Sequence, residues 1–516
     1  MNSENRWSLL ALASIVMVVQ QGSAAGKTAH DLAGRIDRAV DEKLKAEKVA
    51  PSPEASDAEF LRRVSLDITG VIPTAERTKL FLDSSDPDKR AKLIDELLAS
   101  PEYGKRMADV WQALLLARAP NIIRYQPSHF AKWLADSFNS NKPWDRMVRE
   151  VLTATGTEDD NPVVIFYLAN DSVDKLTDNV TKNLLGVQLQ CAQCHNHPFT
   201  AWKQTEYWAM AAFFMKVRAD NANRAVRQGS SPGVSEGPQI NRNRRALPES
   251  AKMVPAKFLG GEQPKLIERE AYRPIVADWI TSPKNPYFAR AMANRVWAMM
   301  FGRGIVNPVD DMHEGNEPSH PELLKDLADG FIASGFDVKE LIRAVALGKT
   351  YQRSSKPVEG NADTDRALLA RMPIKVLPAE MLFDSLVQVS GSAPVREGRP
   401  ARQGRGPAAG PRQQFVNFFR ADEGADPTEY NHGIPQALRV MNSAQFNRTT
   451  LVDQLTRNGP KPEEAIERLF LSVLSRRPTS AETTRFTAHL TKAGLRSGCN
   501  DVLWVLLNSS ECVVNR

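Results

Sequence analysis

The chain has 516 residues, of which 42% are hydrophobic and 25% charged, and its formal net charge is +6 at pH 7. This is the composition of an ordinary globular protein, which excludes global disorder, and the length is too great for one compact core. We therefore expect two or three domains. A charge of +6 spread over this length is too weak to indicate a nucleic-acid-binding protein.

The first residues are typical of an export signal. Arg6 supplies a positive charge, and the apolar stretch Leu9–Val19 is about as long as a signal core and too short to span a bilayer comfortably. Small residues follow and allow cleavage near residue 25. No later segment is long and apolar enough to cross a membrane. We expect residues 1–25 to be a signal peptide and the mature protein to be periplasmic or extracellular; an uncleaved N-terminal anchor is the alternative.

Helical patterns dominate the rest of the chain. Apolar residues repeat at helical spacing after Pro462, and Pro478 stops that pattern. A Ser or Thr followed three residues later by Glu, which is a helix start signal, recurs at Ser56, Ser319 and Thr479. Alternating strand patterns are scarce. The fold class predicted is mainly α, with two helical domains joined by a polar, loop-rich linker.

Two polar stretches set the expected domain boundaries. Residues 218–265 are aperiodic and contain Gly, Pro and Ser, so we expect a linker between a first helical domain (26–217) and a second (266–516). Residues 394–414 are rich in Arg, Gly and Pro and predict a solvated insertion in the second domain. Because arginine-rich tracts can also bind polyanions, an acidic polysaccharide is a candidate partner.

The most informative motif is "LQCAQCHNHPF" at Leu189–Phe199. In the spacing Cys-x-x-Cys-His, two thiols can bind the two vinyl groups of one haem while the adjacent histidine ligates the iron. Haem c is therefore the candidate cofactor, with Cys191, Cys194 and His195 as its binding residues. Such a protein would be an electron-transfer or redox module that serves an unidentified redox partner or envelope protein.

A sixth ligand to the iron would have to come from elsewhere in the chain. Methionine is the usual choice for electron transfer, and Met210 and Met215 are the nearest downstream candidates. Both also fit the apolar face of a helix, where core packing is the more common explanation for methionine.

Three other interpretations of the motif stay open. A thioredoxin-like dithiol needs its first cysteine at the start of a helix, which Pro198 would break. A zinc or other transition-metal site that includes His195 and His197 has suitable ligand types, but four ligands within seven residues crowd a tetrahedron. The third is a structural disulfide or a pair of buried thiols in a tight turn. The protein would then be a non-haem binding or scaffold protein of the cell envelope.

A second candidate cluster lies in "NPVDDMHEGNEPSHPELL", which contains Asp310, Asp311, His313, Glu314 and His320. Such a cluster could bind a divalent cation or serve acid–base chemistry. In the structural alternative, Arg295 forms an internal ion pair with Asp310, and Ser319 caps a helix in which His320 is a first-turn residue. No nucleophile elbow, phosphate loop or zinc-protease motif is present, so the sequence leaves open whether the protein is an enzyme.

The two remaining cysteines, Cys499 and Cys512, flank an apolar helical pattern. A continuous helix would hold their Cα atoms about 20 Å apart, and a disulfide needs less than about 7 Å. We expect both to be buried and not paired with each other.

Several stretches resemble a known pair of domains. "FLRRVSLDITGVIPT", "LLASPEYGKRMADVW" and "LLGVQLQCAQCHNHPFTAWKQTEYWAMAAFF" are similar to the first of two paired domains in large families of planctomycete exported proteins, the planctomycete cytochrome-C-like domains of unknown function. "NPYFARAMANRVWAMMFGRGIVNPVDDMHEGNEPSHPELLKDLADGF", "LPAEMLFDSLVQVSG" and "GIPQALRVMN" are similar to the second. The resemblance covers nearly all of the mature chain in the same order. It implies export, a two-domain layout and a site at Cys191, Cys194 and His195.

Overall fold

The structure is a computed structural model, and it describes residues 28–116, 125–220, 225, 229–238, 254–391, 410–419, 433–442, 446 and 450–516. The export signal expected over residues 1–25 and the greater part of the expected insertion, 394–409, lie outside these residues. Helices account for 60% of the structure and strands for 4%, which confirms the mainly α fold. Within the ranges described, no helix has the length and apolarity needed to cross a bilayer.

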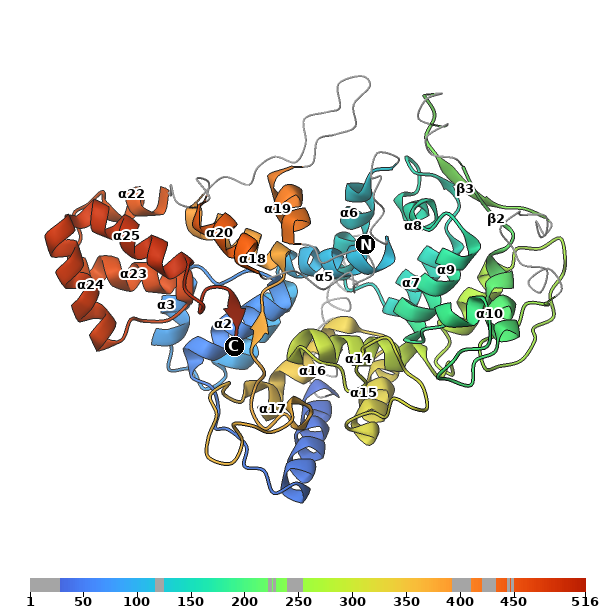
Figure 1. The fold of residues 1–516 in the computed structure, drawn as a ribbon, viewed down its shortest axis with the longest axis horizontal. Helices are drawn as coiled ribbons and strands as arrows, with labels where there is room; N and C mark the ends of the chain where they lie inside the picture. Colours follow the sequence, from blue (N-terminus) through green and yellow to red (C-terminus); the bar gives the residue numbers. More distant parts are fainter. Residues whose placement is uncertain are drawn as a thin grey trace, which may run out of the picture.

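The N-terminal half is a succession of medium-length helices (Figure 1). After a helix over residues 28–46 come α2 (Asp57–Thr69), α3 (Ala75–Asp83), α4 (Lys89–Ala99), α5 (Pro101–Leu115), α6 (Pro127–Asn139), α7 (Trp144–Thr153), η2 (Pro162–Val164), α8 (Ile165–Ala169), α9 (Val173–Asn179), the π-helical turn η3 (Val180–Leu184), the 3₁₀ turn η4 (Gln190–Gln193), α10 (Gln204–Ala211) and η5 (Ala212–Phe214).

The C-terminal half continues in the same style. Its helices are α13 (Arg273–Ile280), α14 (Phe288–Phe301), α15 (Pro321–Ala333), α16 (Val338–Leu347), α17 (Lys349–Gln352), η6 (Arg366–Leu368), α18 (Ala379–Ser390), α19 (Pro411–Phe419), α20 (Ile434–Met441), α22 (Thr450–Thr456), α23 (Pro462–Leu474), α24 (Ser480–Ala493) and α25 (Leu495–Leu507). Helix α19 begins within the last residues of the expected insertion.

Two small antiparallel sheets complete the described structure. The first has the order β1-β3-β2, with β1 at Gly156–Thr157, β2 at Val217–Ala219 and β3 at Gly233–Glu236. Its strand β3 lies in the stretch expected to be a linker, and it pairs with β1 in the register Gly156↔Val234. The second sheet joins β4 (Lys375–Val376) to β5 (Val514–Asn515) at the C-terminus.

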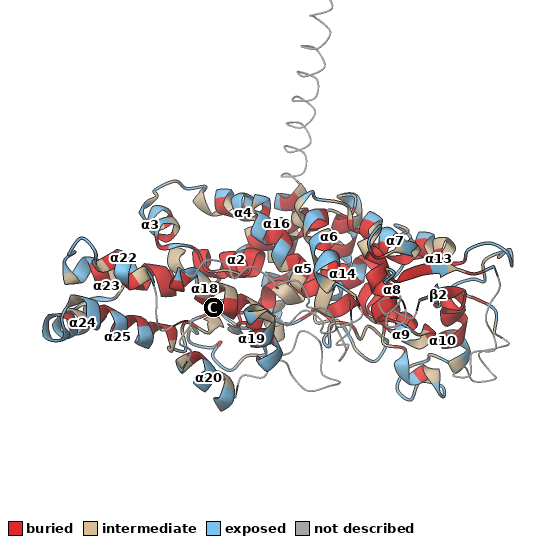
Figure 2. Ribbon diagram, turned by 90° about the horizontal axis from the view of Figure 1, so that it is seen from above, coloured by how far each residue is buried: buried red, intermediate tan, exposed pale blue. Residues whose placement is uncertain are grey.

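The apolar side chains form two cores. The larger one draws on residues 29–372, so both halves of the chain contribute to it, and stacked rings such as Trp144 on Phe288 (6.4 Å between centroids) connect them. The smaller core gathers residues 377–512 with Leu66 and Ile72 of the N-terminal half. Helices α22–α25 lie at one end of the elongated molecule in Figure 1, with α10, β2 and β3 at the other. Figure 2 shows buried residues along its whole length.

The sequence "FLRRVSLDITG" places two adjacent arginines in α2, and both are buried. The Arg62 guanidinium donates to the backbone oxygens of Val473 and Cys512, each at 2.9 Å. Arg63 donates to the backbone oxygen of Tyr351 at 2.7 Å and pairs with Glu59. Because both cations are buried, these bonds satisfy groups that would otherwise be costly to bury, and they fix α2 against the C-terminal segment.

The helix start signals can be compared with the observed caps. Ser56 caps α2 through Glu59 N–H, and Thr479 forms a full capping box with Glu482, as predicted. The prediction for Ser319 is wrong, because α15 starts at Pro321 and its N-cap position is His320. Proline favours the first helical position, which moves the cap to the residue directly before it.

Cys499 and Cys512 are buried free thiols, as expected. Helix α25 ends at Leu507, so Cys512 follows the helix rather than lying within it. Burial raises the pKa of Cys499 to about 11, which keeps this thiol protonated and inert.

Candidate functional site

The Cys-x-x-Cys-His turn (residues 189–197) follows the long helical segment α9–η3 and contains the 3₁₀ turn η4. Leu189 and Ala192 are fully buried and anchor the turn in the main core. Cys191, Cys194 and His195 lie on its exposed side, and both cysteines are free thiols. The local sequence therefore presents the two sulfurs and the imidazole to solvent on a fixed support.

Helix α10 holds this turn through its side chains. Gln204 Nε2 donates to the backbone oxygens of Gln193 (3.1 Å) and Cys194 (2.9 Å), and Trp208 Nε1 donates to the same Gln193 oxygen at 3.0 Å. The backbone N–H of Gln204 donates to Asn196 Oδ1 at 3.1 Å. These bonds satisfy turn carbonyls that have no partner in regular secondary structure and limit movement of the thiols.

The two histidines of the motif differ in the hydrogen bond that each ring makes. Nδ1 of His195 lies 2.6 Å from the backbone oxygen of Asn196. Since a carbonyl oxygen only accepts, Nδ1 carries a proton, and in the neutral ring Nε2 then keeps a free lone pair, the arrangement of a metal-ligating histidine. His197 Nδ1 instead accepts the N–H of Phe199 at 3.2 Å, so its neutral ring carries the proton on Nε2.

The second candidate cluster partly meets this turn. Met312 N–H donates to the Gly186 oxygen at 2.8 Å, which ties residues 310–316, here called the 310–316 loop, to the segment that leads into the turn. Burial lowers the pKa of His197, with Asp311 acting to raise it and His313 to lower it further, so the carboxylate and second imidazole lie near the His197 ring. His313 Nε2 is 3.7 Å from Asp311 Oδ2.

Other members of the second cluster lie elsewhere or support the loop. Asp310 is buried in an ion pair with Arg295, which is the structural alternative set out above. Asn294, which is fully buried, bonds the backbone of Val306 and Val309 and so fixes the start of the loop. Glu314 is exposed.

His320 is a buried neutral imidazole rather than an exposed ligand. Its side chain is 5% exposed, and Nε2 has no hydrogen-bond partner among the residues described. Burial, with a smaller contribution from Lys43, lowers its pKa to about 4. Its Nδ1 lies 3.1 Å from Ser319 Oγ.

Two groups beside the turn were missed by sequence reasoning. Tyr207 of α10 donates its hydroxyl to Asp178 Oδ1 of α9 at 3.1 Å. Burial, with a contribution from Asp174, raises the pKa of Asp178 to about 7, and the pKa of Tyr207 is raised by burial, by Asp178 and, to a smaller extent, by Cys194. Perturbed groups of this kind gather at functional sites. The acidic pair Asp174 and Asp178, spaced four residues apart on one helix face, was the only signal available.

The described side chains limit which groups could ligate a metal ion. Across the described ranges, His, Cys, Asp and Glu side chains do not gather in any group of three or more able to hold a metal ion. Met210 and Met215, the expected candidates for a sixth ligand, are 0% and 2% exposed and pack within the main core.

Two family models match the chain, one in each half. Residues 35–219 match the model described as a protein of unknown function (DUF1549, PSCyt2), and residues 272–421 match a second of that description (DUF1553, PSD1). No curated protein and no solved structure matches significantly. These matches fit the predicted two-domain layout, and the Cys-x-x-Cys-His turn lies in the first region and the 310–316 loop in the second. The chain therefore has the paired arrangement of a DUF1549 region followed by a DUF1553 region.

Proposed function

We propose that this protein attaches haem c through Cys191 and Cys194, with His195 as the proximal ligand, and serves as an exported electron-transfer or redox module. The observation that carries the proposal is the Nδ1 contact of His195 with the Asn196 oxygen, which leaves Nε2 free to ligate iron. Two exposed free thiols at the required spacing stand beside it.

The donor set fits the group. Each thiol can add to one vinyl group, and the ring of His195 is already in the tautomer that a proximal ligand needs. Bound haem would supply a one-electron iron couple. The side chain of Phe199 is 84% exposed beside the turn, so it is available to cover an apolar group.

The chain's own residues would position this site and influence its charge. Gln204 and Trp208 hold the backbone of the turn, so the two sulfurs keep a fixed spacing. Asp178 and Tyr207 place a titratable carboxyl beside it. An export signal in residues 1–25 would deliver the chain to the periplasm or cell exterior, where haem of this type is attached.

The test is covalent haem in the protein made with an active haem-attachment system. We expect a haem stain on a denaturing gel and a pyridine haemochrome spectrum from the wild type. Cys191→Ala and Cys194→Ala should each lose one thioether bond, and the double variant should lose the stain, while Cys499→Ala, which removes a thiol outside the turn, should keep it.

The absence of covalent haem would have a definite meaning. A wild-type protein that is folded and exported but carries no covalent haem would overturn the proposal. Thiol titration before and after reduction would then separate the alternatives. New thiols released by reduction indicate a disulfide in a non-haem envelope protein. Free thiols at both Cys191 and Cys194, without haem, would exclude covalent haem and the disulfide alike.

A further inference from the structure

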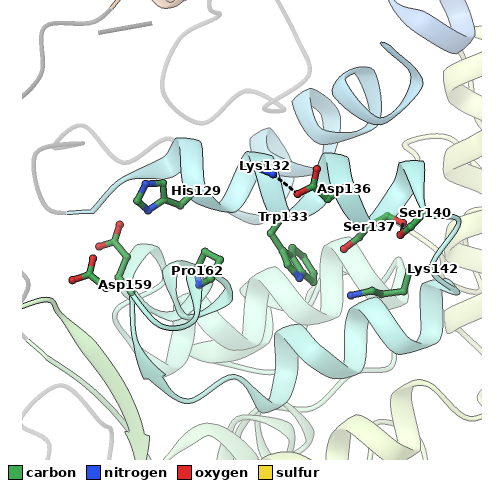
Figure 3. Close-up of a pocket in the computed structure, with 10 residues that line it drawn as sticks. His129, Lys132, Trp133, Asp136, Ser137, Ser140, Lys142, Asp159 and Pro162 are labelled. Carbon is green, nitrogen blue, oxygen red and sulfur yellow. Dashed lines mark hydrogen bonds and ion pairs between the residues drawn. The ribbon is translucent and has the colours of Figure 1, made fainter. Parts of the chain in front are cut away.

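A cavity of ≈ 420 Å³ lies between α6 and the segment that follows β1 (Figure 3). Its residues do not belong to the Cys-x-x-Cys-His turn or to the 310–316 loop. The volume lies in the range of about 300–1,000 Å³ that is usual for small-molecule sites. The indole of Trp133, which is half-buried, forms part of the wall, and Pro162 from η2 faces it across the cavity.

The two ammonium groups of the cavity already have anionic partners. Lys132 forms an ion pair with Asp136 one turn along α6. Lys142 donates to both carboxylate oxygens of Glu150, at 3.1 and 2.8 Å, and its Nζ lies 5.5 Å from the centroid of the Trp133 ring. Neither cation is therefore free to neutralise a bound anion.

The opposite end of the cavity is polar. Glu158 is buried, and one of its oxygens accepts the backbone N–H of Gln126. Burial raises the pKa of Glu158, and the nearby His129 acts in the opposite direction. Asp159 is exposed beside them, and Figure 3 shows its carboxylate and the His129 ring at the same end of the cavity.

We propose that this cavity is a binding site for an uncharged saccharide. An anionic ligand would meet the carboxyl groups of Asp136, Glu158 and Asp159, and both lysines of the cavity are already paired, so the charges disfavour an anion. The apolar indole and the neutral polar groups of the lining, rather than the charges, favour an uncharged ligand over a cation. The proposal is independent of haem attachment.

The remaining groups suit a polyhydroxylated ring. The indole of Trp133 stacks on Phe130 (5.6 Å between ring centroids), and the part of it that lines the cavity offers apolar surface to the C–H groups of a sugar. The carboxylate of Asp159 can accept sugar hydroxyl protons, and the ring of His129 can both donate and accept. The hydroxyl of Ser140 donates to the Ser137 backbone oxygen at 3.1 Å, so it can serve a ligand as an acceptor. A few polar groups around an apolar wall are typical of specific small-ligand sites.

The experiment is saturation-transfer NMR followed by calorimetry on the full mature protein. The neutral probes are maltotriose, cellotriose and laminaritriose, the anionic probe is trigalacturonate, and the cationic probe is glucosamine trimer. Binding is compared between wild type, Trp133→Ala, Asp159→Asn and Trp504→Ala. Trp504 is 44% exposed on α25 and provides the matched control for loss of a surface indole.

We expect saturable binding of at least one neutral probe, weakened about tenfold or more in Trp133→Ala and unchanged in Trp504→Ala. Asp159→Asn, which alters an exposed side chain and should fold normally, should also weaken binding. Failure of all three neutral probes to bind, tighter binding of either charged probe, or wild-type affinity in both cavity variants would overturn the proposal.

Discussion

Met312 donates its backbone N–H to the carbonyl oxygen of Gly186 at 2.8 Å, and this bond joins the DUF1553 region to the segment that leads into the Cys-x-x-Cys-His turn. Gly186 has a φ of +69°, and a Cβ added to it would lie 3.3 Å from Ala291 Cβ and 3.4 Å from Met312 Sδ. The close approach of the two regions thus depends on a residue without a side chain.

The first prediction follows from this contact. Gly186→Ala should lower the free energy of unfolding by about 1–3 kcal/mol, because it adds left-handed strain and crowds Met312. Gly335→Ala is the matched control, since Gly335 has a φ of +71° but no atom within 4 Å of an added Cβ. Urea denaturation of both variants measures the difference. Equal losses in the two variants would show that crowding against Ala291 and Met312 adds nothing to the backbone strain.

The second prediction concerns the Asp310–Arg295 ion pair. Both side chains are buried, and the Arg295 guanidinium also lies 5.5 Å from the ring centroid of Trp111. Asp310→Asn leaves a buried cation without its anion, so it should cost about 3–5 kcal/mol of stability.

An exposed pair provides the control for that change. Asp329→Asn removes the partner of Lys325 on the surface of α15 and should cost less than about 1 kcal/mol. Thermal and urea unfolding of the two variants are compared at neutral pH. An Asp310→Asn variant as stable as the wild type would contradict the structural role of Asp310. Asp310 would then again be a candidate ligand for a divalent cation.

The features that could be predicted from the sequence are those that depend on residues close together in the chain. The capping box at Thr479 and Glu482 is a contact between residues three apart, so the sequence pattern alone identifies it. The N-cap predicted at Ser319 is one position too early, because Pro321 determines where α15 begins and His320 precedes it. Local spacing predicts a candidate site at Cys191, Cys194 and His195, but the exposure of its thiols and the tautomer of His195 depend on the folded structure.

Contacts between distant segments were beyond the sequence pattern. The hydrogen bond from Met312 to Gly186 and the bond from Tyr207 to Asp178 join segments whose approach depends on helix packing. The two candidate clusters therefore looked independent in the sequence. Only the structure shows that Asp311 and His313 lie near His197, and that Asp310 belongs to the support of the loop instead.

The third prediction is a pH dependence that originates at Asp178. Burial raises the pKa of this carboxyl to about 7 in the folded protein, well above its value of about 3.9 in an unfolded chain. Between these values the folded state binds the proton and the unfolded state does not, so this group lowers stability as pH rises from about 4 to about 7.

Asp178→Asn removes that titration. Relative to the wild type, the variant should gain stability progressively from pH 4 to pH 7 and keep a constant advantage above pH 7. Urea unfolding at pH 4, 5.5, 7 and 8.5 checks this, with the exposed Asp171→Asn as control. A difference between variant and wild type that does not change with pH would contradict it.

The fourth prediction concerns acid sensitivity at His320. Burial lowers its pKa to about 4, whereas an unfolded histidine titrates near 6.5. Below about pH 6.5 the unfolded chain takes up a proton that the folded protein excludes, so this group makes the wild type lose stability as pH falls from about 6.5 to about 4.

His320→Gln removes the titration, and a substitution at the exposed His489, His489→Gln, serves as control. Over this pH interval the unfolding free energy of His320→Gln should fall less steeply than that of the wild type, even if the variant is less stable at pH 7. Parallel curves for His320→Gln and the wild type would mean that His320 is charged in the folded protein, which its buried Nε2 without a described partner argues against.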